Sequence, residues 1–81
     1  MAMLTNEDLK NIISDALSAE IDENSNSSNV PEWDSLGHLS VLSALDTKTD
    51  GKTSDISGIG ELDSFQELKE KLVSESIMNE N

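Results

Sequence analysis

Apolar residues recur at steps of three and four in three separate stretches of this chain, which is the spacing of one buried face of an α-helix. The first stretch predicts a helix from about Asn6 to about Glu20, with Thr5 as its N-cap. Glu7 and Asp8 suit the positive N-terminal end of such a helix. Its apolar positions are Leu4, Leu9, Ile12, Ile13, Ala16 and Leu17.

A second stretch predicts a helix that starts at Asp34 or Ser35 and fades around Asp46-Thr47. Pro31 keeps the chain before it extended. Gly37 is a poor helix residue one turn after the start, which indicates that either access to the backbone or a close approach by another group matters there. The apolar positions of this helix are Leu36, Leu39, Val41, Leu42, Ala44 and Leu45.

A third stretch predicts a last helix from Asp63-Ser64 onward, where these two residues resemble a capped start. Its apolar positions are Phe65, Leu68, Leu72 and Val73. A short irregular piece with Ile56 and Ile59 precedes it and predicts one extra short helix. Because no strand pattern is visible, the predicted fold is all-α: a single domain over residues 1–81 with three main helices and one short helix, third in chain order, before the last.

Two polar segments contain few core-forming residues. Residues 22–32 are rich in Asn, Ser, Asp and Glu side chains that compete with helical hydrogen bonds, and they predict a mobile loop. Residues 75–81 follow the last apolar stripe and predict a frayed tail.

Charge narrows the range of partners. Seventeen acidic residues face five basic ones, for a net charge of -12, so nucleic acid would be repelled. The same charge favours partners with basic patches, or it simply keeps a small protein soluble. The chain has no cysteine, no apolar run of membrane-spanning length and no signal peptide at Met1, which predicts a soluble cytoplasmic protein.

Residues for catalysis are scarce. Ser35 and His38 are three positions apart on a predicted helix, but no third orienting group accompanies them, so a serine hydrolase is disfavoured and no enzyme activity is expected. The carboxylates are dispersed, which argues against a metal site built around His38. Residues 46–51 have a faint likeness to a calcium loop without its closing glutamate. No metal is therefore expected.

Ser35 has two possible roles at the start of the second helix. It is either a simple cap or the bearer of a phosphorylated group, because free N–H groups and the helix dipole stabilise a phosphodiester there. Ser64 is a rival, because Asp63-Ser64 repeats the same dipeptide, and its place before Phe65 favours a cap.

Residues 33–39, Trp-Asp-Ser-Leu-Gly-His-Leu, resemble the attachment motif of free-standing bacterial acyl carrier proteins, and the order of elements is similar over nearly the whole chain. The resemblance implies a small four-helix bundle and a covalent 4'-phosphopantetheine on Ser35, transferred from coenzyme A by a phosphopantetheinyl transferase. It implies that Asp34, Leu36 and Leu39 belong to the surface that partners read. It also implies a monomeric carrier that presents acyl thioesters to loading and acyl-using enzymes, as in lipid or fatty-acid biosynthesis.

The second helix departs from that family, because the segment 36–44 contains no acid. A partner would therefore meet either the apolar, charge-free face around Leu39 or acids of the other helices. Periodicity turns Val41, Leu42 and Leu45 inward and leaves Leu39 and Ser43 outward. The alternative to a carrier is an unmodified helical interaction module with the same fold. The cargo stays open among fatty acyl, polysaccharide, polyketide and aminoacyl pathways.

Overall fold

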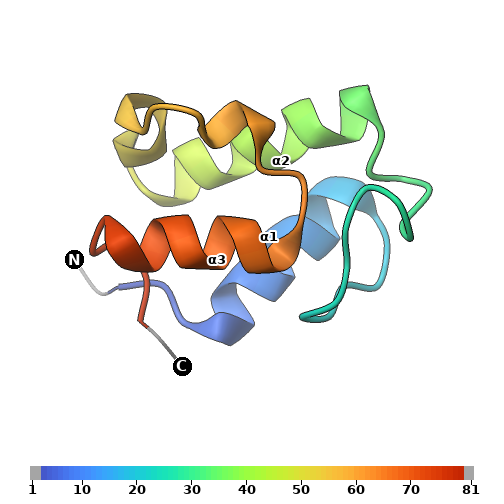
Figure 1. Ribbon diagram of the computed structural model, residues 1–81, viewed down its shortest axis with the longest axis horizontal. Helices are drawn as coiled ribbons and strands as arrows, with labels where there is room; N and C mark the ends of the chain where they lie inside the picture. Colours follow the sequence, from blue (N-terminus) through green and yellow to red (C-terminus); the bar gives the residue numbers. More distant parts are fainter. Residues whose placement is uncertain (1–2, 80–81) are drawn as a thin grey trace.

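The computed structural model describes residues 3–79, which form three α-helices and two short 3-10 turns (Figure 1). The elements in chain order are α1 (Asn6–Leu17), α2 (Ser35–Lys48), η1 (Lys52–Asp55), η2 (Ile59–Glu61) and α3 (Phe65–Ser74). Residues 3–79 include no strand, only two isolated backbone bridges, Leu4 with Met78 and Asn26 with Ser64. The all-helical prediction is confirmed.

The segment between α2 and α3 differs from the prediction, because η1 and η2 stand where one short third helix was expected. Gly51 and Gly58 each precede one of these turns and adopt φ of 85° and 82°, a left-handed conformation that interrupts a continuous helix. The segment still packs, since Thr53, Ile56 and Ile59 are buried. The described residues therefore form three α-helices, and a four-helix bundle is not confirmed.

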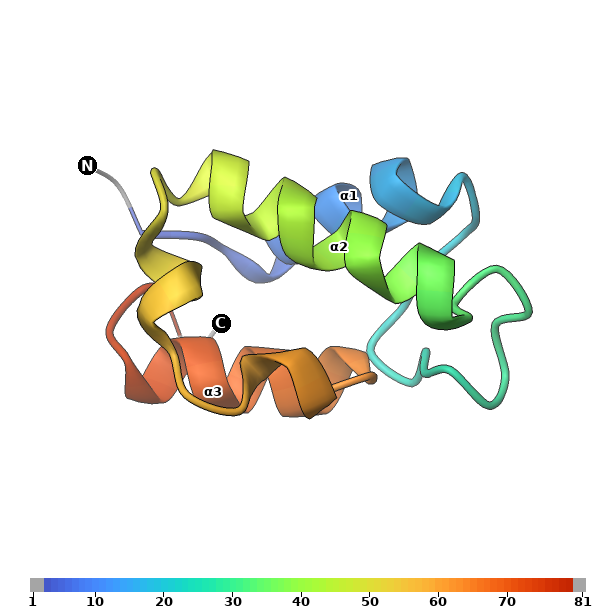
Figure 2. The same ribbon diagram turned by 90° about the horizontal axis from the view of Figure 1, so that it is seen from above.

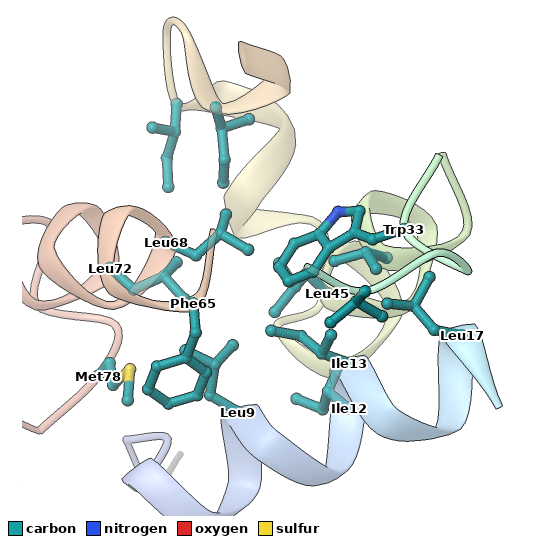
Figure 3. Close-up of a cluster of buried hydrophobic side chains, with 14 residues drawn as sticks. Leu9, Ile12, Ile13, Leu17, Trp33, Leu45, Phe65, Leu68, Leu72 and Met78 are labelled. Carbon is teal, nitrogen blue, oxygen red and sulfur yellow. The ribbon is translucent and has the colours of Figure 1, made fainter. Parts of the chain in front are cut away.

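The helices enclose one core. α2 and α3 run in the same direction and α1 runs against them (Figures 1 and 2). Phe65 and Met78 lie beside Leu9 at one end of the core, and Trp33 lies near Leu45 and Leu17 at the other (Figure 3). The two aromatic side chains, Trp33 and Phe65, are therefore both buried in the core. No helix within residues 3–79 is long and apolar enough to cross a membrane.

The start of α1 is as predicted and its end is not. The Thr5 side chain accepts a hydrogen bond from the Asp8 N–H, and the Asp8 carboxylate accepts one from the Thr5 N–H, which is a capping box. The helix ends at Leu17 and not near Glu20, because Ser18 turns left-handed at φ 54°. The Ser14 hydroxyl donates to the Ala19 carbonyl and stabilises that early turn.

The polar loop over residues 22–32 is bonded to the start of α3. The Ser27 N–H donates to the Asp63 carbonyl at 3.0 Å, and the Phe65 N–H donates to the Ser25 carbonyl at 2.9 Å. Ser25 is buried despite the polar sequence around it. Mobility of this loop stays a prediction, while its hydrogen bonds place it beside α3.

The expected frayed tail is not what residues 75–79 form. The Leu4 N–H donates to the Ile77 carbonyl at 2.9 Å, and the Asn79 N–H donates to the Leu4 carbonyl at 2.8 Å. Met78 is 1% exposed. Burial of this apolar side chain against the start of the chain outweighs fraying, and residues 80–81 lie outside the described part of the chain.

Candidate functional site

The first turn of α2 is built by its neighbours in sequence. Asp34 is extended, and its carboxylate accepts a hydrogen bond from the Gly37 N–H at 2.8 Å, so Asp34 is the N-cap. The His38 N–H donates to the Asp34 carbonyl at 2.8 Å. Ser35 is thereby the first helical residue, it is exposed, and its hydroxyl has no hydrogen-bond partner among residues 3–79.

Gly37 marks a close approach, as its sequence position predicted. A Cβ atom at this position would lie 2.1 Å from the Glu32 carbonyl oxygen and 2.8 Å from the Leu17 Cδ2 atom. Both distances are far inside van der Waals contact. Only glycine therefore lets the chain before Trp33 lie against the first turn of α2.

His38 uses both ring nitrogens. The Trp33 Nε1–H donates to His38 Nδ1 at 3.0 Å, so Nδ1 is the acceptor and the ring proton lies on Nε2. Nε2 lies 2.9 Å from the Gly60 carbonyl oxygen in η2. The structure brings no His38 nitrogen into a hydrogen bond with the Ser35 hydroxyl, so the Ser–His pair considered from the sequence is not assembled within the described residues.

A shallow open hollow of about 410 Å³ lies beside Ser35. Its lining consists of Ser27, Trp33, Asp34, Ser35, His38, Gly60, Glu61 and Asp63. Three of these residues are acidic and none is lysine or arginine. Across residues 3–79, no three histidine or carboxylate side chains converge closely enough to hold a metal ion.

The outer face of α2 carries two exposed leucines. Leu36 is 75% and Leu39 is 62% exposed, and Ser43 on the same helix is also exposed. Val41 and Leu45 are fully buried, and Leu42 is half-buried, as periodicity predicted. α2 is therefore apolar both toward the core and toward the surface near Ser35.

Ser64 is a cap and not a second free serine. Its hydroxyl oxygen accepts from the Glu67 N–H at 3.1 Å, and its O–H donates to the Glu67 Oε1 atom at 3.0 Å. It is the N-cap of α3. The structure therefore confirms the prediction that Asp63-Ser64 is a capped helix start.

The pairing of His38 with Gly60 was not predicted from the sequence. Twenty-two residues separate the two partners, and the acceptor is a backbone carbonyl, which any residue type supplies. No local signal could have identified it, apart from a histidine within a largely apolar helix.

Comparison with protein-family models, curated proteins and solved structures found no match.

Proposed function

We propose that this chain is a carrier protein that holds an acyl or related group as a thioester on a 4'-phosphopantetheine arm attached to Ser35. The observation that carries the proposal is the exposed and unbonded hydroxyl of Ser35, at the first position of α2 within the attachment-like motif. A helix cap engages its hydroxyl, as Ser64 does. The Ser35 hydroxyl is left available for modification.

The first turn of α2 suits a phosphodiester. An α-helix leaves its first N–H groups without partners inside the helix, and Asp34 takes only that of Gly37. The remaining N–H groups and the helix dipole favour an anion on the Ser35 oxygen. The nearby carboxylates of Asp34, Glu61 and Asp63 oppose an anion inside the hollow, so the arm points away from it.

The transferase would read Asp34, Leu36 and Leu39, since these side chains are exposed around Ser35. The same charge-free leucine face would meet the acyl-loading and acyl-using enzymes. The η1–η2 segment would occupy the place of the short third helix in a carrier fold. The protein would act as a cytoplasmic monomer with no catalytic step of its own.

Intact-mass measurement after incubation with coenzyme A and a broad-specificity phosphopantetheinyl transferase tests the proposal. The chain should gain the mass of one phosphopantetheine, Ser35→Ala should gain none, and Ser64→Ala should gain the same mass as the original chain. No gain by the unaltered chain, or a gain that survives Ser35→Ala, contradicts the proposal.

A second candidate is an unmodified interaction module, which the exposed Leu36 and Leu39 side chains would serve equally well. Such a protein would bind its partner regardless of Ser35. The mass experiment separates the two functions, because only a carrier acquires the arm.

A further inference from the structure

One imidazole ring joins three parts of the chain around Ser35. Its Nδ1 atom receives the indole N–H of Trp33, which lies in the segment before α2. Its Nε2 atom reaches the backbone carbonyl of Gly60 in η2. The ring itself belongs to α2, one turn beyond Ser35.

The segment around η2 has few other hydrogen bonds to the rest of the fold. Its backbone bonds are local: the Glu61 N–H donates to the Gly58 carbonyl, and the Leu62 N–H donates to the Ile59 carbonyl. Among residues 3–79, the contact between His38 and Gly60 is the hydrogen bond that links η2 to α2. The other attachment of this segment is apolar packing, through buried Ile56 and Ile59 and half-buried Leu62.

The indole of Trp33 depends on the same ring. Trp33 is 1% exposed, so an unpaired indole N–H there would carry the full cost of a buried donor. The two rings lie 6.3 Å apart between centroids and 29° from parallel. His38 is thus both the acceptor that fixes Trp33 and the donor that holds η2.

We propose that His38 is a positioning residue whose imidazole fastens η2 to the Ser35 end of α2 and fixes the Trp33 indole beside it. Each ring nitrogen makes one hydrogen bond, because Nδ1 only accepts, from the Trp33 indole, and Nε2–H only donates, to the Gly60 carbonyl. If Ser35 carries the arm, which rests on the proposed function, this link also sets how the serine is presented to the transferase.

Two conservative variants separate the tasks. His38→Asn places an amide oxygen where Nδ1 lies but is too short to reach Gly60. His38→Gln places an amide N–H near Nε2 but removes the acceptor for the indole. His38→Ala removes both hydrogen bonds. The amide of Leu72, a buried residue in α3, serves as the reference for global unfolding.

Amide hydrogen exchange and Trp33 fluorescence are the measurements, because Trp33 is the single tryptophan. Relative to Leu72, exchange at Glu61 and Leu62 should rise roughly three- to tenfold in His38→Asn and stay near the original rate in His38→Gln, as expected for one lost hydrogen bond. Trp33 emission should shift to longer wavelength in His38→Gln and remain unchanged in His38→Asn. Identical behaviour of the two variants in both measurements overturns the proposal.

The link to presentation of Ser35 is read separately, as kcat/KM of the transferase. It should fall roughly tenfold in His38→Ala and less in each conservative variant. An unchanged kcat/KM in His38→Ala overturns this part of the proposal. If the original chain is not modified at all, the carrier function fails, and the exchange and fluorescence data still decide whether His38 positions η2.

Discussion

The starts of α2 and α3 carry the same dipeptide, Asp-Ser, but in different registers: the N-cap is the aspartate in α2 and the serine in α3. At α2 the aspartate is the N-cap, and Ser35 is the first helical residue, with a hydroxyl that has no hydrogen-bond partner in the described part of the chain. At α3 the serine is the N-cap, and the Asp63 carboxylate accepts from the Ser27 hydroxyl at 2.7 Å. A shift of one residue in where the helix begins changes a serine from an N-cap into an exposed side chain at the first helical position.

The third residue of each helix extends the difference. Glu67 in α3 returns a side-chain contact to Ser64 and closes that cap. Gly37 in α2 has no side chain, and the chain at Glu32 fills the space that a side chain would need. Both starts thus have a side-chain cap, but at α3 the third residue adds a second side-chain contact to the cap, whereas at α2 the third residue leaves room for a close backbone approach.

Among substitutions at the two helix starts, Gly37→Ala should produce the largest loss of stability. The new Cβ atom would collide with the Glu32 carbonyl, and we expect the free energy of unfolding to fall by about 3 kcal/mol, as in severe overpacking. Glu67→Ala at the equivalent position should cost about 0.5 kcal/mol. Urea denaturation followed by circular dichroism measures both, and equal losses would show that the α2 start is not held by close approach.

Gly60→Ala is the matched control for adding a methyl group to a glycine. A Cβ atom there would lie 3.9 Å from the Leu42 Cδ1 atom, which is ordinary contact. Its stability should stay within about 0.5 kcal/mol of the original chain.

The caps should give the next largest effect and test the register directly. Asp34→Ala and Ser64→Ala each remove the side chain that accepts from the third N–H of a helix, so each should lower the free energy of unfolding by about 1 kcal/mol. Ser35→Ala removes no hydrogen bond within the described residues and should be close to neutral. A loss in Ser35→Ala as large as that in Ser64→Ala would contradict the assigned register.

Acid should weaken the contacts between Glu23 in the loop over residues 22–32 and α1, and this effect should be the smallest. The Glu23 carboxylate accepts from the Asn6 side chain at 2.9 Å and lies 3.5 Å from the Lys10 ammonium, while its backbone carbonyl accepts from Gln66 in α3. The Asn6 hydrogen bond and then the Lys10 charge lower the pKa of Glu23. A lowered folded-state pKa stabilises the fold above the ordinary glutamate range, and this stability is lost as pH falls through the lowered value.

Thermal unfolding from pH 6 to pH 3 tests this. Glu23→Gln should show a shallower acid loss of Tm than the original chain, because no carboxylate is left to protonate at this position. Glu20→Gln, an exposed position without such contacts among residues 3–79, is the control and should follow the original profile. Superimposable profiles for all three chains would rule out a role for Glu23.

Local chemistry explains which parts of this fold were predictable. The caps at Thr5, Asp34 and Ser64 depend on side chains within three residues; the caps of α1 and α3 were predicted from the sequence, and that of α2 was narrowed to Asp34 or Ser35. The close approach at Gly37 was also anticipated, because a glycine near the start of a helix calls for a spatial reason.

Contacts between distant segments were not predictable. The bridge between Leu4 and Met78 packs residues that were expected to be a frayed tail. The contact between His38 and Gly60 places η2 beside the hollow next to Ser35. Neither partner pair has a local signature, since a backbone carbonyl, which any residue type supplies, accepts each of these bonds. The early end of α1 was also missed, although it is local: Ser18 is left-handed, and the Ser14 hydroxyl donates to the Ala19 carbonyl across the turn.

The bridge between Leu4 and Met78 also sets how this unit can be joined to something larger. Leu4 and Met78, near the two limits of the described residues 3–79, lie side by side, at the end of the molecule away from the first turn of α2 (Figure 1). A short peptide joining them would close the chain into a ring, and a host protein could accept the unit as an insert in one of its surface loops. In either form Ser35 would face outward, on the side opposite the join.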